Sequence, residues 1–299
     1  MNRFRVVGLL FLGVFMLAAS STAFAGRMQK DLGENIIETS DNFKTKRRST
    51  YSADDPHDLS AIEMKKVSPV DGMVMMAVPA GQFLMGSDEG HPDERPAHVV
   101  YLHTYWIDQT EVTNAQYARC VESGSCELPI DPAFYLDDDL NYHPVVYVDW
   151  ESANTYCQWA GRRLPTEAEW EKAARGTDNR TYPWGEQGDC SRANFWDCPD
   201  FDFTSPVGYY DEKGVSPYGA YDMAGNVWEW VSDWYDLEYY QESPVLNPQG
   251  PASGIFHVWR GGSWNCNQTS ARSAGRGKYN PIYWQDLIGF RCALDADSP

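Results

Sequence analysis

The chain has 299 residues, of which 42% are hydrophobic and 14% aromatic. That length allows at most two domains and that composition can fill a core, which excludes a chain disordered throughout. With 24 Lys and Arg against 43 Asp and Glu, the net charge is −19, so we expect no nucleic-acid partner. The 24 Gly, 18 Pro and 12 Trp argue against a helical bundle and predict a loop-rich fold with large rings in its core.

The first 25 residues have the pattern of an export signal. Arg3 and Arg5 precede an apolar run over residues 6–18, and small residues end the segment at Ala25. We predict a signal peptide over 1–25, cleaved before Gly26, and therefore a periplasmic or secreted protein. The alternative is a membrane anchor, but the apolar run is shorter than the roughly 20 residues that a span needs. No later stretch approaches about 18 uninterrupted apolar residues, so no stable membrane insertion is expected.

Residues 26–68 are predicted to be a disordered linker. They are polar, mixed in charge and almost free of large apolar groups, so they cannot bury enough surface to offset the entropy of ordering. The basic cluster at 44–48 is interpreted as a solvated part of this linker, with docking on an acidic surface as the alternative.

Short strands open the patterned part of the chain, from residue 69. Apolar runs at 74–78 and 83–85 flank a Pro-Ala-Gly turn and predict two strands joined by that turn. Residues 101–107 alternate at a strand's period of two.

Three helices follow. Thr113 and Gln116 form the pattern of a capping box, which predicts a helix to about Glu122. A second helix starts near Asp149 and stops at Gly161, and a second capping box opens a third over 166–174. From residue 185 onward the sequence predicts turns, aromatic residues and short strands.

Seven cysteines, an odd number, leave at least one thiol outside any intrachain disulfide. In an exported chain neighbouring thiols are usually oxidised. The spacings from Cys120 to Cys126 and from Cys190 to Cys198 would let the chain close on itself. The remaining three are Cys157, Cys266 and Cys292.

Several motifs, in order, resemble the formylglycine-generating enzyme, or sulfatase-modifying factor, family. The resemblance covers roughly residues 70 to 294 and implies a single domain over 69–299. It implies an α+β, elaborated C-type-lectin-like fold with little regular secondary structure, stiffened by calcium. The motifs are VPAGQFLMGS at 78–87, DQTEVTNAQY at 108–117, HPVVYVDW at 143–150, WAGRRLPTEAEWE at 159–171, YDMAGNVWEW at 221–230, RGGSW at 260–264 and GFRCA at 289–293.

The resemblance also implies a chemistry, which this chain matches only in part. Family enzymes oxidise a substrate cysteine to formylglycine with O2 and a copper(I) ion held between two thiolates, soft ligands that suit that ion. Cys266 lies where the first thiolate belongs, and Ser263 matches a residue beside the copper site. No second cysteine follows before Cys292, so we do not expect copper binding. Standard oxidase activity is therefore doubtful, and whether the chain is an enzyme stays open.

The family further implies a disulfide between Cys157 and Cys292, which would leave Cys266 free. Three interpretations of Cys266 remain. It is a lone ligand or nucleophile, for which Arg272 and Arg276 are the closest cations along the chain. It is an inert, packed side chain. Or it forms an intermolecular or unexpected disulfide.

Calcium is the expected cofactor, as a structural ion. The resemblance places one site at Asp222, Gly225, Val227 and Glu229, where carboxylates and carbonyls can surround a hard cation that takes 6–8 oxygens. The alternative is ordinary turn carboxylates.

A second calcium site matches the family less well. Asn194 and Phe195 fit its first half, and Asp200 or Asp202 would supply the acid after a loop that is one residue shorter.

Two functions remain. In the first, an exported protein binds a protein or peptide partner, with a sulfatase as one candidate, or modifies it by a variant chemistry at Cys266 and Ser263. In the second, it is an active oxidase that makes formylglycine in a sulfatase or related partner. The histidines lack zinc spacing, and most of the tryptophans are interpreted as core rings rather than ligand contacts.

Overall fold

The computed structural model describes residues 64–196, 198 and 200–296. The predicted signal peptide and residues 26–63 of the predicted linker lie outside this range. The last part of that linker is folded, which corrects the boundary expected at residue 69. Residues Lys65–Val67 form strand β1, which pairs antiparallel with β2, and Ser68 is buried.

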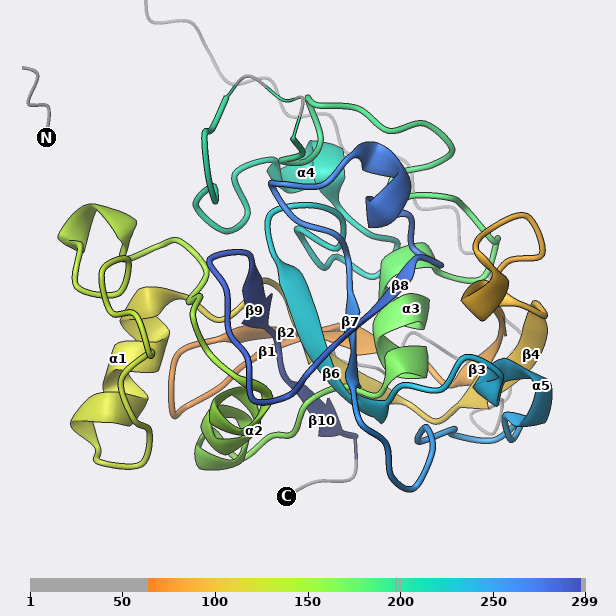
Figure 1. Cartoon of the computed structure of the whole chain (residues 1–299), viewed down its shortest axis with the longest axis horizontal. Helices are drawn as coiled ribbons and strands as arrows, with labels where there is room; N and C mark the ends of the chain where they lie inside the picture. The colour runs from red at the N-terminus through yellow and green to blue at the C-terminus, as the bar shows by residue number, and fades with distance from the viewer. Residues whose placement is uncertain (1–63, 197, 199, 297–299) are drawn as a thin grey trace, which may run out of the picture. The chain divides into compact units, whose positions relative to one another are not determined.

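In the described part of the chain, ten short strands form three small sheets (Figure 1). The first sheet has the order β1-β2-β5-β10, the second is the hairpin β3-β4, and the third has the order β8-β7-β6-β9, with β6 and β9 parallel. The strands after β1 are β2 (Val74–Val78), β3 (Gly81–Met85), β4 (His98–Leu102), β5 (Tyr105–Asp108), β6 (Trp228–Trp234), β7 (His257–Arg260), β8 (Arg276–Tyr279), β9 (Ile288–Phe290) and β10 (Ala293–Asp295).

One strand prediction is confirmed and one needs correction. The two strands around the Pro-Ala-Gly turn are β2 and β3; β2 pairs with β1 and β5, whereas β3 pairs with β4. The alternating run over 101–107 is interrupted at His103 and Thr104, so that its halves belong to β4 and β5 in different sheets.

The three predicted helices are confirmed. Helix α1 (Asn114–Glu122) and helix α3 (Glu167–Arg175) each begin at a complete capping box, built on Thr113 and on Thr166. Helix α2 (Trp150–Trp159) is capped by the Asp149 side chain. The remaining helical turns are short: η2 (Pro92–Glu94), η3 (Asp138–Leu140), α4 (Asp211–Gly214), α5 (Tyr239–Glu242) and η4 (Gln268–Ala271).

Helix α3 is buried along its whole length. It contacts β3, β4, β6 and β7, and Figure 1 shows it beside β7. Its carboxylates Glu167 and Glu171 bind the buried Arg260 of β7, each at 2.8 Å. Arg276 of β8 also binds Glu167, so the helix is tied to two strands by charge-assisted hydrogen bonds.

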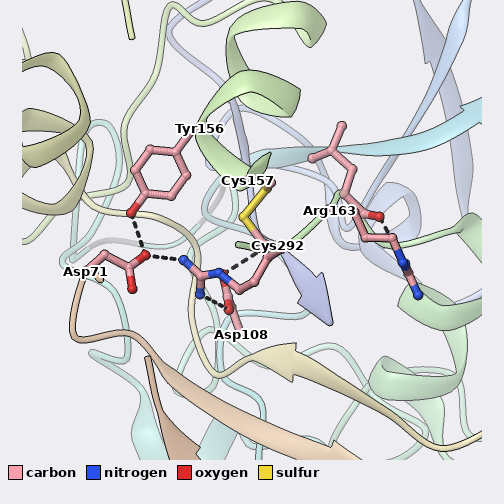
Figure 2. The surroundings of a disulfide bond; sticks show 8 residues. Asp71, Asp108, Tyr156, Cys157, Arg163 and Cys292 are labelled. Carbon is pink, nitrogen blue, oxygen red and sulfur yellow. Dashed lines mark hydrogen bonds and ion pairs between the residues drawn. A yellow bond between two sulfur atoms is a disulfide. The ribbon is translucent and has the colours of Figure 1, made fainter. Parts of the chain in front are cut away.

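A disulfide joins helix α2 to the end of the chain (Figure 2). Cys157 and Cys292 are bonded and fully buried. Beside them, Arg162 binds both Asp71 and Asp108, and the Tyr156 hydroxyl donates to Asp71 at 2.7 Å. Burial raises the pKa of Asp108 to about 7, although Arg162 opposes that shift. This cluster fixes the segment after α2 against β5 and the chain's last strands.

Candidate functional site

Cys266 lies in a loop that two glycines allow to turn sharply after β7. Gly261 and Gly262 have φ values of 95° and 74°, in the left-handed region that side chains disfavour. A Cβ on Gly262 would lie 2.8 Å from the Ala271 Cβ, so the turn also packs closely on η4. The loop places the Ser263 hydroxyl 3.4 Å from the Cys266 sulfur, within reach to donate a weak hydrogen bond. The two predicted site residues are therefore in contact.

Cys266 lies at the edge of the hydrophobic core, partly exposed and partly packed against core side chains. Ser263 is fully buried, whereas Cys266 is partly exposed. The Cys266 carbonyl accepts from the amide of Trp196, whose own side chain is 64% exposed. A reactive or binding group at Cys266 would therefore meet a partner at the surface beside Trp196.

Cys266 is the one free cysteine. The three expected disulfides are confirmed: Cys120–Cys126, Cys157–Cys292 and Cys190–Cys198. A fully buried, disulfide-bonded Cys292 cannot supply the missing thiolate. Any metal at Cys266 would thus have a single sulfur ligand from this chain, and the residues present do not fit a copper(I) ion held by two thiolates.

The two cations nearest to Cys266 along the chain are engaged with buried carboxylates. Arg272 binds both oxygens of Glu94, and Arg276 binds both oxygens of Glu167. Arg272 and Thr269 line a cavity of about 730 Å³ that also contains His91 and Arg175, but Cys266 is not among its lining residues. This cavity and the free thiol are separate features.

The first predicted calcium site lies in a tight, buried turn. Asp222, Gly225 and Asn226 all have positive φ, an unusual backbone for two non-glycine residues. The Asp222 carboxylate accepts from the Gly208 amide at 2.5 Å. Glu229 has both oxygens occupied: Arg291 binds them at 2.7 Å each, and the Trp170 indole donates to one of them at 2.8 Å.

One carboxylate of this region, Glu111, was not among the predicted ligands. It is fully buried, and its Oε1 accepts from the Asn226 amide at 3.0 Å. Its Oε2 has no partner among the described residues. Glu111, Asp222 and Glu229 thus share a buried region in which Arg291 is the cation. Burial raises the pKa of Glu111 well above its ordinary value and that of Asp222 to about 6, and carboxyl oxygens of this kind are ligands that a hard cation takes. The motif DQTEVTNAQY contains Glu111, but local spacing does not relate it to a turn more than 100 residues later.

The second predicted site is only partly assembled. Asn194 is buried, its amide donates to the Phe203 carbonyl at 2.7 Å, and its Oδ1 has no partner in the described part of the chain. The Phe195 carbonyl accepts from the Cys198 amide at 3.0 Å. Asp200 and Asp202 are exposed. Within residues 64–196, 198 and 200–296, no group of three or more His, Cys, Asp or Glu side chains is arranged to hold a metal. A cation here would depend on carbonyl and amide oxygens as well as carboxylates.

Comparisons with known proteins agree with this architecture. A family model described as the sulfatase-modifying factor enzyme 1-like domain matches residues 60–296. The formylglycine-generating enzyme of Streptomyces coelicolor is 36% identical over 281 residues, which cover 74% of this chain and 88% of that enzyme. The structure of PvdO from Pseudomonas aeruginosa superposes with a TM-score of 0.67 at 27% identity, over 77% of this chain and 97% of PvdO.

Other relatives have a different name and a greater length. The serine/threonine-protein kinase pkn1 of Chlamydia caviae is 40% identical over 244 residues, covering 73% of this chain but only 37% of the kinase. The chain thus spans just over a third of the length of such relatives. The formylglycine-generating enzyme of Streptomyces coelicolor, by contrast, matches over most of its length, and the family model matches residues 60–296 of this chain. The chain belongs to the sulfatase-modifying factor, or formylglycine-generating enzyme, family and has that family's mixed α and β, loop-rich fold.

Proposed function

We propose that this chain is an exported member of the family that binds a protein or peptide partner at the surface around Cys266, without the two-thiolate copper chemistry. The observation that carries the proposal is the cysteine inventory. Six of seven cysteines are paired, and the free one contacts the Ser263 hydroxyl at a partly exposed position. One sulfur offers a partner contact or a variant side-chain chemistry, but not the linear pair of soft ligands that copper(I) prefers.

Export is supported by the three disulfides and by the sequence of the first 25 residues. Disulfides persist in the periplasm and outside the cell, and are rare in reducing compartments. In the described part of the chain no helix has the length and apolarity to cross a membrane. Mass spectrometry of the mature protein tests this step, and we expect a chain that begins at Gly26.

The decisive experiment measures oxidation and binding on the same peptide. Purified protein, loaded with copper(I) in the presence of O2, is incubated with a Cys-x-Pro-x-Arg peptide of an exported sulfatase. We expect the peptide to bind and its mass to stay unchanged, while a formylglycine-generating enzyme run alongside converts the thiol to an aldehyde. Aldehyde formation that disappears in Cys266→Ser would establish the oxidase alternative instead. Absence of any polypeptide binding would reject the proposal.

We also propose a structural calcium ion at the turn that contains Asp222. Asp222 and the carbonyls of Gly225 and Val227 would hold it, and its charge would offset the excess of carboxylates around Arg291. The unpartnered oxygens of Glu111 and Asn194 support the presence of a cation in this part of the molecule. Elemental analysis of protein prepared without chelator tests it, with at least one calcium per chain as the expected result.

A further inference from the structure

Four aromatic rings from three separate loops form a continuous row, which we call the aromatic strip. Phe203, Phe134, Tyr147 and Trp284 follow one another with ring centroids 5.7, 5.9 and 5.7 Å apart. Phe203 is 36% exposed and Trp284 37%, while the two rings between them are partly buried. Large apolar side chains that stay exposed together are typical of an interaction surface.

The spacing of the rings suits an extended polypeptide. Alternate side chains of an extended strand point to the same side and are about 6.7 Å apart. This repeat is close to the 5.7–5.9 Å separation of neighbouring rings, so alternate side chains of an extended segment can contact neighbouring rings. The rings are inclined at 57° to 87° to one another and do not form the flat platform on which a sugar ring would stack.

Tyr147 at the centre of the strip has a strained backbone. Its φ is 60°, in a region that bulky residues rarely adopt. Its amide donates to the Gln285 carbonyl at 3.1 Å, which holds the residue beside the loop that contains Trp284. Strain of this kind persists where the surrounding structure enforces it, and it is concentrated at functional sites.

The charge around the strip has one sign. The segments that provide its rings, 127–149, 194–207 and 280–287, contain ten Asp and Glu residues and neither Lys nor Arg. Burial raises the pKa of Tyr147, and the negative charges of Asp286 and Asp131 raise it further. Exposed Asp137, Asp138 and Asp139 continue the acidic rim along η3. Ring faces flanked by carboxylates attract ammonium and guanidinium groups.

Backbone contacts place the strip next to the Cys266 loop. The loop over 280–287 contacts Tyr147 on one side, and on the other the Trp264 indole donates to the Asp286 carbonyl at 3.3 Å. At one end of the strip, the Phe203 carbonyl accepts a hydrogen bond from the Asn194 side-chain amide. Asn194 lies two residues before Trp196, whose backbone amide donates to the Cys266 carbonyl. A segment bound on the strip would therefore lie close to the free thiol.

We propose that the aromatic strip, with its acidic rim, binds an extended basic segment of a partner polypeptide, in which Lys or Arg side chains lie on the ring faces. This proposal rests on the proposed function in that both require a polypeptide partner. It goes further in naming the surface that binds the partner and the chemistry that the surface selects.

Three cysteine-free heptapeptides test the strip separately from any thiol chemistry. They alternate Ser with Arg, with Glu or with Leu, carry a fluorophore, and are titrated with the full-length protein at about 50 mM NaCl. We expect the Arg peptide to bind and the other two to bind at least about tenfold more weakly. Removal of one ring by Trp284→Ala should weaken the Arg peptide about two- to fivefold, and Tyr147→Ala with Trp284→Ala at least about tenfold. Raising NaCl to about 300 mM should weaken it further.

Two matched variants control for general effects. Ile255→Ala removes another exposed apolar side chain, and Glu242→Gln another exposed carboxylate. Both should bind as the unchanged protein does, whereas Asp286→Asn should bind the Arg peptide more weakly. Unchanged melting temperatures confirm that the variants are folded.

Three outcomes would overturn the proposal: equal binding of the Arg and Glu peptides, binding unaffected by loss of both rings, or self-association of the chain that disappears in Trp284→Ala. If the Arg peptide fails to bind while the sulfatase peptide still binds, the strip is rejected and the proposed function stands. If neither peptide binds, both are rejected.

Discussion

Removal of the disulfide between Cys157 and Cys292 should destabilise this protein more than removal of the disulfide between Cys120 and Cys126. The two bonds span 135 and 6 positions of the chain. A cross-link restricts the unfolded chain by an amount that grows with the logarithm of the loop it closes. That relation gives about 5 kcal/mol for the long loop and about 2.4 kcal/mol for the short one at 25 °C. The pair of variants is Cys157→Ala/Cys292→Ala and Cys120→Ala/Cys126→Ala.

The assay is urea unfolding followed by tryptophan fluorescence, with Cys266→Ser in every protein so that no free thiol can exchange. We expect the free energies of unfolding of the two double variants to differ by about 2–3 kcal/mol. Packing acts in the same direction, because Cys157 and Cys292 are fully buried and their removal leaves space in the core. A separate titration of the folded, non-reduced protein that retains Cys266 should find one thiol, and three would contradict the pairing.

Equal losses in the two variants, or a larger loss from the short loop, would refute the reasoning. Such a result would mean that the unfolded chain is already compact enough to hold residues 157 and 292 together, or that local strain outweighs loop entropy.

Three further predictions concern buried charges and the proposed ion. His257 lies between the rings of Trp150 and Trp234, and burial lowers its pKa to about 4. The free energy of unfolding should therefore keep its full value above pH 6.5 and decrease by roughly 2–3 kcal/mol as the pH falls to 4, because the unfolded chain binds a proton at this histidine first. The decrease should be smaller in His257→Phe, which is checked by measuring unfolding at both pH values. Arg291→Met should lower the free energy of unfolding by about 3–5 kcal/mol because it leaves the buried Glu229 without its cation. The Arg163 side chain is partly exposed, so Arg163→Met should lower the free energy of unfolding by about 1 kcal/mol or less. Similar losses in the two variants would contradict the burial argument. Removal of calcium by a chelator should lower the melting temperature of the unchanged protein and should have a smaller effect on Asp222→Ala. If the chelator leaves the melting temperature of the unchanged protein as it was, the structural ion is rejected.

Features that depend on a few neighbouring residues could be predicted from the sequence. The capping boxes at Thr113 and Thr166 and the caps at Asp149 and Gly161 require hydrogen bonds that reach at most four residues. The short disulfides form between cysteines that a single turn brings together. The family motifs placed Cys157 against Cys292, which spacing alone did not.

Pairing over long distances could not be predicted in this way. The sequence predicted two strands around the turn after Val78 but not their partners. Several antiparallel partners satisfy the same apolar alternation, and in the structure β2 pairs with β5. The same limit applies to the folded residues 65–67, which become a strand only because β2 offers an open edge.

The sequence by itself determined the helices, the family and that at least one thiol lies outside the intrachain disulfides, since each follows from local hydrogen bonds, ordered motifs or a count of cysteines. Only the tertiary structure decided which groups meet across the chain: Glu111 with the turn at Asp222, Arg291 with Glu229, and the aromatic strip from three loops. The physical reason is that hydrogen bonds close a turn within a few residues, whereas a buried charge or an exposed ring finds its neighbours through the packing of the whole domain.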